Sequence, residues 1–329
     1  MLEDSRVVYL FVYVSDLLKS REFYENKMGL RVIEADSACV KFDAGQVILA
    51  LNRAEDYGIA LPKNKDNSAD IVFLVEKLDE MKEALASRGI AFSKTDWYQP
   101  GGITDFYDPD GHWLTLYQPN EEAMKWPSGD RIRAVLRARQ NRNSSKASSA
   151  STSQAKPIET NTRSGLGLDG SNLFYVFFFV KDPTAATVFY HNDLGLRDLE
   201  GGPCSSGSGG DSDGVVKYDT GGILLTTHRI YEERTQDQVD EHVCPPRDLN
   251  EGSMRSVAPA FYVRNVDSAL RKLSEKRPVP QPTVSRSAIG VVASLEDPGG
   301  HLLFLYEPSE QALGSPSGTK IQEILATPL

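Results

Sequence analysis

Two sets of alternating aromatic residues are the first feature of this sequence that could do chemistry. The odd positions of an apolar run near the N-terminus are aromatic, and a similar run follows 166 residues later; the sets are Tyr9, Phe11, Tyr13 and Tyr175, Phe177, Phe179. Because side chains alternate across a β-strand, the three rings of each set share one face. Such a face can stack a planar or cationic small molecule, and the same rings can equally fill their own cavity.

The cysteine, serine and histidine residues do not indicate a catalytic or metal site. The three cysteines, Cys39, Cys204 and Cys244, are widely spaced and form no CxxC motif, which favours a reducing compartment. No Ser or Cys has a recognisable activating context, so covalent catalysis is not indicated. His112 and His301 each follow a glycine in a tight-turn motif, and we expect both to stabilise the turn rather than to bind a metal.

An internal repeat organises these residues. The aromatic run, a following Asp, a Phe-Tyr pair and a Gly-Leu-Arg triplet all return 166 positions later, and Asp-Pro-x-Gly-His at 108–112 returns at 297–301. A Pro-Ser-Gly motif also occurs twice, at 127–129 and 316–318. These matches occur in the same order, which indicates a tandem duplication. A basic, Ser-rich stretch separates the copies, so the sequence predicts domains at 1–138 and 171–329 and a linker at 139–170.

Each copy itself contains a second, weaker internal repeat of secondary-structure elements. A β-branched and aromatic strand, predicted at 7–14, leads through the helix-start signal Ser15-Asp16 into a helix that ends at Gly29. Three short strands follow, and the same order of elements then repeats. The further predicted elements are strands near 30–35, 38–42, 46–52, 70–75, 90–94, 103–107 and 113–118 and a helix at 78–88. The sequence therefore predicts a βαβββ unit that occurs four times.

The repeated motif resembles the vicinal oxygen chelate superfamily, which includes glyoxalase I, type I extradiol dioxygenases and bleomycin resistance proteins. The resemblance covers residues 6–135 and 172–326, and it includes the Asp-Pro-Asp-Gly-His turn before the closing strand. It implies an α+β fold in which four βαβββ modules pair into two glyoxalase/bleomycin-resistance-type domains with curved mixed sheets. It also favours pairing of the two modules within each copy and places the aromatic runs on the concave face of a sheet.

Many enzymes of that superfamily bind a divalent metal on this concave face, through His, Gln or Glu. The matching positions are Tyr9, Asp70 and Thr115 in the first copy and Tyr175, Ala258 and Phe304 in the second. A metal needs several donors that converge on one point. We therefore predict no cofactor, no metal ligand and no catalytic residue at these positions; a divalent metal would have to bind elsewhere.

Together, the resemblance and the aromatic faces predict a metal-independent small-molecule binding protein with an aromatic-lined cavity in the first domain. Asp70 could face a cationic ligand, Trp97 could lie in a mobile loop over the cavity, and His228 could lie at its mouth. The predicted ligand-binding residues are Tyr9, Phe11, Tyr13, Asp70, Trp97, Trp113, Thr115, Tyr117, Tyr175 and His228. Two alternatives stay open: a glyoxalase-like lyase or extradiol-type dioxygenase with a divalent metal at atypical positions, and an interaction module whose cavities are filled.

Charge and hydropathy limit the expected partners. The chain has 36 Lys and Arg against 46 Asp and Glu, a formal charge of −10, and its basic stretch at 131–163 has no aromatic residue to stack bases. We therefore expect a small aromatic or cationic partner and no nucleic acid. No run approaches the ~18 apolar residues of a membrane span, and no secretory signal is visible, so the sequence predicts a cytoplasmic protein. The oligomeric state is left open.

Overall fold

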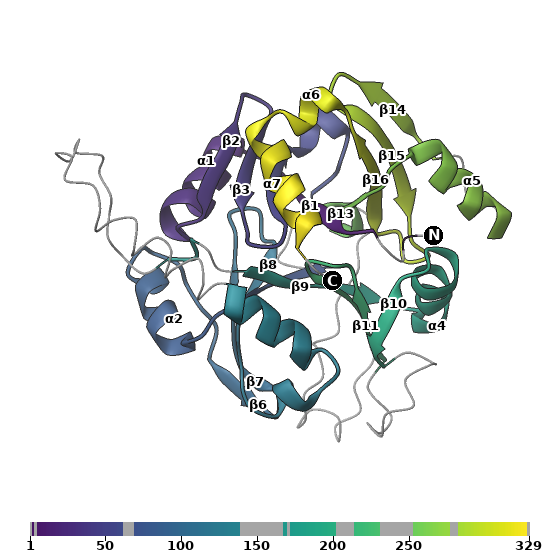
Figure 1. Cartoon of the computed structure of the whole chain (residues 1–329). Coiled ribbons are helices and arrows are strands. Elements are labelled where there is room, and N and C mark those ends of the chain that lie inside the picture. The colour runs from purple at the N-terminus through teal and green to yellow at the C-terminus, as the bar shows by residue number, and fades with distance from the viewer. Residues whose placement is uncertain are drawn as a thin grey trace.

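Four βαβββ modules follow one another along the chain, as the sequence predicts (Figure 1). The computed structural model describes residues 2, 5–61, 69–138, 167–169, 172–201, 214–230, 253–276 and 282–327. The strands are β1 (Val7–Val14), β2 (Arg31–Ala35), β3 (Cys39–Asp43) and β4 (Ile48–Arg53) in module 1; β5 (Ala69–Leu74), β6 (Asp96–Tyr98), β7 (Gly101–Tyr107) and β8 (Trp113–Pro119) in module 2; β9 (Asn172–Val180), β10 (Arg197–Glu200), β11 (Val215–Asp219) and β12 (Leu224–Arg229) in module 3; and β13 (Val257–Tyr262), β14 (Val284–Ser287), β15 (Gly290–Glu296) and β16 (Leu302–Pro308) in module 4.

A helix follows the first strand of every module. In module 1, the Asp16 carboxylate caps this helix by accepting from the backbone N–H groups of Leu18 and Lys19, each at 3.0 Å. Gly29, with φ of 78°, then takes the left-handed conformation that turns the chain into β2. The helices are α1 (Leu17–Arg21) continued by the π-helical η1 (Glu22–Lys27), α2 (Leu78–Ala86), α4 (Pro183–Thr187) continued by η4 (Val188–Asp193), and α5 (Val266–Lys276).

The modules form two eight-stranded sheets, and each sheet takes one module from each half of the chain. Sheet A has the order β14-β15-β16-β13-β1-β4-β3-β2, and sheet B has the order β10-β11-β12-β9-β5-β8-β7-β6. Figure 1 shows the result: purple and yellow-green segments form the upper sheet A, and blue and teal segments form the lower sheet B. The α+β fold of four paired modules is confirmed.

The predicted pairing of modules within each copy is wrong. The seam of sheet A joins β1 to β13, and the seam of sheet B joins β5 to β9, both antiparallel. Hydrophobic alternation predicts which face of each strand is buried. It does not predict which two modules pair through their first strands, because these strands carry equivalent faces. The boundaries at 138 and 171 thus mark halves of the duplication, and each sheet spans both halves.

The largest apolar core lies between the two sheets. The even positions of β1, such as Leu10 and Val12, belong to it together with residues of all four modules. Two equivalent hydrogen bonds join the modules of each half within this layer: Tyr24 Oη donates to Asp108 at 3.1 Å, and Tyr190 Oη donates to Asp297 at 2.9 Å. The modules of one half are therefore partners in the core, although they lie in different sheets.

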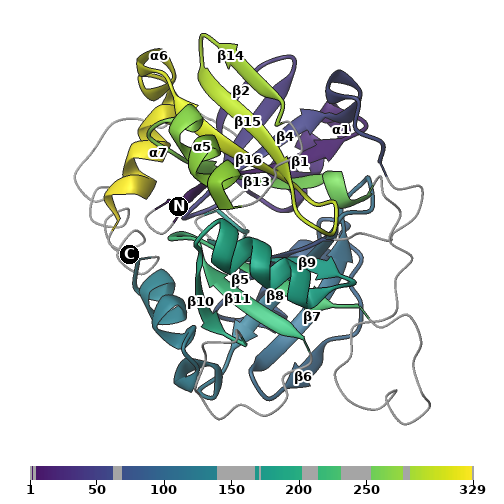
Figure 2. The same cartoon turned by 90° about the vertical axis from the view of Figure 1, so that its right-hand side faces the viewer.

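The opposite face of each sheet carries the odd positions of β1 or β9, and we call it the tyrosine face, after Tyr9 in sheet A and Tyr175 in sheet B. A tail helix packs on each tyrosine face: α7 (Pro316–Ala326), which follows α6 (Glu310–Leu313), on sheet A, and a helix over 129–138 on sheet B. Figure 2 shows both tail helices on the same side of the molecule. In the described part of the chain, no helix is long and apolar enough to cross a membrane.

Some predicted elements differ from those observed. The strand expected near 90–94 is displaced to β6, and only an isolated bridge from Phe92 to Phe106 remains there. The linker predicted at 139–170 lies outside the described residues except for 167–169.

Candidate functional site

The ten predicted ligand-binding residues lie on two different sheets. Sheet A carries Tyr9, Phe11 and Tyr13; sheet B carries Asp70, Trp97, Trp113, Thr115, Tyr117, Tyr175 and His228. The prediction of one aromatic cavity in the first domain is therefore wrong, because β1 and β5 are central strands of separate sheets. Each candidate surface instead combines one module of the first half with one module of the second.

Side chains of the protein itself fill the tyrosine face of sheet A. Tail helix α7 packs over Tyr9 at one end, and Ile59 and Leu61, which follow β4, pack against Phe11 and Phe304 at the other. The rings also contact one another, with ring centroids 5.4 Å apart for Tyr9–Phe11 and 5.5 Å apart for Phe11–Phe304. This face is an apolar core of its own.

A buried ion pair anchors the tail helix of sheet B. Lys217 Nζ lies 2.5 Å from Glu200, and the Glu200 carboxylate accepts from the backbone N–H of Ser128 at 2.8 Å. The Lys217 ammonium also lies over the rings of Trp126 and Tyr175, at 4.7 and 5.5 Å from their centroids. Burial alone would raise the pKa of Glu200, but the Lys217 charge and the hydrogen bonds from Lys217 and Ser128 lower it.

The same arrangement recurs in sheet A. Lys41 Nζ lies 3.2 Å from Glu34, and Ser317 Oγ donates to Glu34 at 2.7 Å. Ser128 and Ser317 are the serines of the two Pro-Ser-Gly motifs, so this repeated tail motif serves to fasten a helix across each tyrosine face. Next to the Lys41–Glu34 pair, burial raises the pKa of Tyr9 to about 12, which keeps its phenol neutral at ordinary pH.

Elsewhere on the tyrosine face of sheet B, two carboxylates meet one hydroxyl. Thr115 Oγ1 lies 3.0 Å from both carboxylate oxygens of Asp70 and 2.8 Å from Oδ1 of Asp105. Asp70 is buried and Asp105 is partly exposed. The register brings them together, because Thr115 on β8 stands directly opposite Asp105 on β7, and the neighbouring β5 supplies Asp70.

Aromatic rings border these carboxylates. Trp113 stacks on Phe179 with centroids 5.6 Å apart and an interplanar angle of 13°, and Phe179 contacts the His228 ring at 5.7 Å. Phe177 pairs with Asp70 in the β5–β9 seam and is partly exposed. The arrangement combines negative charge with aromatic faces, a chemistry that suits a cationic or hydrogen-bonding organic molecule.

The internal repeat provides a position-by-position comparison of the two tyrosine faces. Sheet A has an apolar or smaller residue at each polar position of sheet B: Ala258 for Asp70, Phe304 for Thr115, Ser294 for Asp105 and Ala50 for Thr226. The same fold therefore forms without these polar groups. Their concentration on sheet B marks this face as the candidate binding site.

Three predicted residues lie apart from that cluster. Trp97 pairs with Gly102 and thus points to the face opposite Asp105; its ring is 57% exposed and lies over Gly102, in a β-hairpin rather than a loop over the cavity. Tyr117 is buried beneath the tail helix, and its hydroxyl donates to Pro100 O at 2.9 Å. Tyr175 is buried in the same cluster.

The two motif histidines stabilise turns in the core. His112 Nδ1 lies 2.8 Å from Asp108, and His301 Nδ1 lies 2.9 Å from Asp297, with both rings buried. The same two carboxylates accept from Tyr24 and Tyr190. The structural role predicted for these histidines is confirmed.

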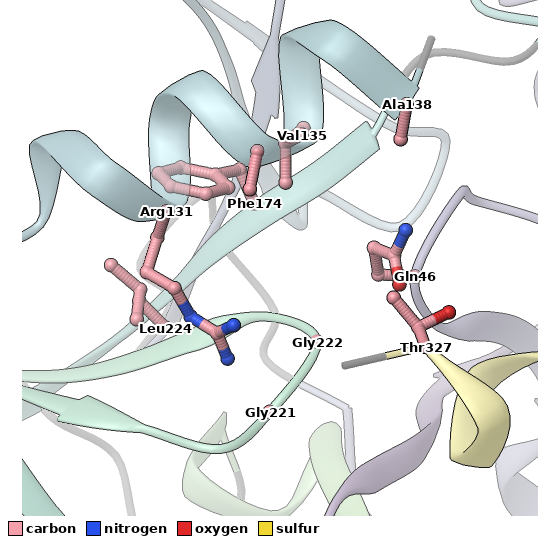
Figure 3. A pocket seen from close by; sticks show the side chains of 10 residues that line it. Gln46, Arg131, Val135, Ala138, Phe174, Gly221, Gly222, Leu224 and Thr327 are labelled. Carbon is pink, nitrogen blue, oxygen red and sulfur yellow. The ribbon is translucent and has the colours of Figure 1, made fainter. Parts of the chain in front are cut away.

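A small cavity lies where the two halves meet, away from the tyrosine-face cluster. It encloses about 50 Å³ and is lined by Gln46, Gly222 and the tail-helix residues Arg131 and Val135, among others (Figure 3). The Arg131 guanidinium is held by Asp219 at 2.5 Å. A volume of this size admits water but no organic ligand.

Comparisons with known proteins agree with this architecture. Residues 6–116 match the model of the Glyoxalase/Bleomycin resistance protein/Dioxygenase superfamily. The matched range spans most of modules 1 and 2. Residues 172–326 repeat its motifs and its modules.

Solved structures with a similar fold cover nearly the whole chain. Glyoxalase I from Zea mays is 13% identical, with 98% of this chain and 95% of that chain covered and a TM-score of 0.54. A putative dioxygenase from Bacillus subtilis is 12% identical, with 96% and 90% covered and a TM-score of 0.53. At this level of identity the likeness concerns the fold, and chemistry has to be argued from the residues.

The residues at the superfamily's metal positions do not fit a metal centre. Ala258 and Phe304 have no donor atom, and burial raises the pKa of the Tyr9 and Tyr175 phenols. Asp70 and Thr115 remain as oxygen donors on sheet B. Within the described ranges, no group of three or more His, Cys, Asp or Glu side chains is placed to hold a metal ion.

Sequence reasoning missed two residues of the sheet B cluster, Asp105 and Thr226. Counting outward from the Asp-Pro-Asp-Gly-His turn would have placed Asp105 opposite Thr115 in the antiparallel hairpin. Thr226 has no such local signal, because only the seam between β5 and β9 places it in one row with Asp70, on the other side of Phe177.

Proposed function

We propose that this protein is a metal-independent binding protein for a small aromatic or cationic molecule, and that its site is the part of the tyrosine face of sheet B that carries Asp70, Asp105 and Thr115. The observation that carries the proposal is the contrast between the two faces. Sheet A is filled by apolar side chains, whereas the equivalent positions of sheet B carry Asp70, Asp105, Thr115 and Thr226. Polar groups that the fold does not need indicate a ligand.

The aromatic rings on this part of the face supply the apolar part of the site. Trp113 and Phe179 stack on each other and are buried with Ile230, and Phe177 beside them is partly exposed, so a planar ligand would lie against the Phe177 ring. Because the site draws Asp70 from the first half and Phe177 from the second, it requires both halves of the chain. Free, half-buried Cys39, whose pKa burial raises to about 11, is an unreactive thiol compatible with the reducing, cytoplasmic setting that we propose.

Tryptophan fluorescence tests the proposal, because two tryptophans lie on opposite faces of sheet B. Wild type, Trp97→Phe and Trp113→Phe are titrated with a panel of small aromatic and cationic compounds. We expect saturable quenching in wild type and in the Trp97→Phe variant, and a much smaller change in Trp113→Phe, because Trp113 alone of this pair borders the carboxylates. Failure of every compound to saturate the signal would refute the proposal.

Metal analysis of the purified protein tests the alternative of a glyoxalase-like lyase or extradiol-type dioxygenase with a metal at atypical positions. Stoichiometric iron, nickel, manganese or zinc that survives dialysis would favour that alternative over metal-independent binding.

A further inference from the structure

A hollow lies where the two halves of the chain meet, apart from the sheet B cluster, and we call it the junction hollow. Its inner part is the cavity of about 50 Å³ described above, and its outer part encloses about 210 Å³ and opens to solvent. Gln46, Ala138 and Thr327 line both parts, so the two parts adjoin. A space of ~15 Å³ on this measure holds one water molecule, so the outer part has room for a small organic molecule.

Positively charged side chains reach this hollow from both halves. Arg131 of the tail helix on sheet B lines the inner part, and Lys320, at the equivalent repeat position in α7, lines the outer part. Arg6 joins the same wall, because its guanidinium donates to the carbonyl oxygens of Ile324 and Thr327. Burial and the charge of Arg131 lower the pKa of Arg6, so these two guanidinium groups lie close enough to repel each other.

The carboxylates near the hollow compensate these charges only in part. Each of two aspartates is shared between one cation that lines the hollow and one outside it; the groups are Arg131–Asp219–Arg197 and Lys320–Asp43–Arg31. Among the described residues that line the hollow, Glu323 alone carries a carboxylate, which lies 3.3 Å from Lys320. Its side chain is 63% exposed, so solvent screens its charge. The hollow therefore favours an anion.

The wall also offers hydrogen-bond donors that have no other use. A guanidinium has five N–H donors, and only the Nη2 nitrogen of Arg131 has a partner among the described residues, Asp219 at 2.5 Å. The side-chain amide of Gln46 has no hydrogen-bond partner within the described ranges. Figure 3 shows the Arg131 guanidinium and the Gln46 amide at the hollow from two sides.

The close approach of two turns explains why the hollow has one such amide. Gln46 and Gly222 are equivalent positions of the repeat and lie in the β3–β4 and β11–β12 turns. A Cβ at Gly222 would lie 2.5 Å from the backbone oxygen of Gln46, so the second turn has no room for a side chain there. The space beside Gly222 stays open, and the first half supplies the polar group.

We propose that the junction hollow binds a small oxyanion, the carboxylate or phosphate group of a small molecule, between Arg131, Lys320 and Gln46. An oxyanion accepts from several N–H donors at once, and hydrogen bonds to charged donors are the stronger ones. Because these residues come from both halves, a bound anion stabilises the assembled pair of sheets. This site differs in position and in charge from the one proposed on sheet B and does not depend on it.

Calorimetric titration and thermal unfolding test the proposal with defined probes. Sodium phosphate and sodium succinate are compared with sodium chloride at equal ionic strength. We expect phosphate, succinate or both to bind saturably and to raise the unfolding midpoint, and chloride to do neither. A response to phosphate alone assigns a phosphoryl group, and a response to succinate alone assigns a carboxylate.

Variants separate binding in the hollow from the general stabilisation that such salts give to folded proteins. Arg131→Gln should weaken binding about tenfold, because it removes the charged donor of the inner part. Arg197→Gln is the matched control: Arg197 binds the same Asp219 but is 69% exposed and does not line the hollow, so binding should stay as in wild type. Glu323→Gln removes the carboxylate of the hollow and should tighten binding severalfold.

Three results would overturn the proposal. These are no saturable binding of phosphate or succinate to wild type, equal binding by wild type and Arg131→Gln, and weaker binding by Glu323→Gln than by wild type. If Arg131→Gln does not fold, Glu323→Gln decides, because its exposed side chain is tolerant of substitution. The fluorescence panel on sheet B uses other residues and other ligands, so failure here leaves the proposed function unaffected.

Discussion

The ion pair between Lys217 and Glu200 should stabilise the protein far more than its repeat equivalent, Lys41–Glu34. The side chains of Lys217 and Glu200 are 9% and 16% exposed, and the two atoms lie 2.5 Å apart. In the Lys217→Met variant the Glu200 carboxylate stays buried without its cation. Breaking a buried pair in this way costs ~3–5 kcal/mol, and the remaining hydrogen bond from Ser128 places the expected loss near the lower limit, about 3 kcal/mol.

Lys41→Met is the matched control. Its pair lies 3.2 Å apart, and the side chains of Lys41 and Glu34 are 23% and 32% exposed, so solvent screens the charge that remains. The expected loss in the free energy of unfolding is about 1 kcal/mol or less. The two variants should therefore differ by about 2 kcal/mol, although they occupy the same position of the repeat.

Urea-induced unfolding at pH 7, followed by far-ultraviolet circular dichroism, measures both losses from the midpoint and the slope. Adding Glu200→Gln to Lys217→Met removes the unpaired charge and should recover more than 1 kcal/mol of the loss. Equal costs for Lys217→Met and Lys41→Met, or a double variant less stable than the single one, would refute the reasoning that burial determines the strength of this pair.

Three further predictions concern the tail helix, the buried histidine and the assembly of the sheets. Gly129→Ala should lower stability by more than 1 kcal/mol in the same urea assay, because the added Cβ would lie 2.2 Å from Met124 O; an unchanged midpoint would contradict this. Burial alone would lower the pKa of His112, but Asp108 raises it above 6.5, so the stability that protonated His112 contributes is complete below pH 6.5 and is lost as pH rises through the raised pKa. The pKa of Asp108 is lowered from 3.8, so the stability that ionised Asp108 contributes is lost as pH falls through the lowered pKa. Thermal unfolding of wild type and His112→Asn between pH 5 and 9 checks this, and parallel pH profiles would count against it. A chain cut between its two halves should purify as a complex, since both sheets require both halves; independent, folded halves on size-exclusion chromatography would disprove it.

Local sequence patterns predicted the modules well because each module is stabilised by short-range features. Alternation over 7–14 gives β1, the Asp16 cap begins α1, and Gly29 ends the helical turn that follows. The repeated turn at 108–112 and 297–301 likewise forms from its own residues, with Asp108 and Asp297 accepting from the histidines four positions later. These hydrogen bonds join residues close in sequence, so the pattern of each segment predicts them.

The candidate site could be predicted only in part, because its members come from several strands of both halves. Asp70, Trp113 and Thr115 are correctly gathered on one face, since they belong to one module. Tyr9, Phe11 and Tyr13 were grouped with them from the resemblance, and the seam between β1 and β13 moves them to the other sheet. Thr226 reaches the site through β9, which no sequence pattern assigns to β5.

The sequence by itself determined the four modules, the faces of their strands, the two tail motifs and the lack of family metal donors at six positions. Only the tertiary structure decided which modules share a sheet, because alternation is satisfied equally by either pairing of first strands. That decision gathers the polar positions of modules 2 and 3 on sheet B and leaves the apolar positions of modules 1 and 4 on sheet A. The difference between a filled face and a candidate binding face therefore arises from long-range strand pairing.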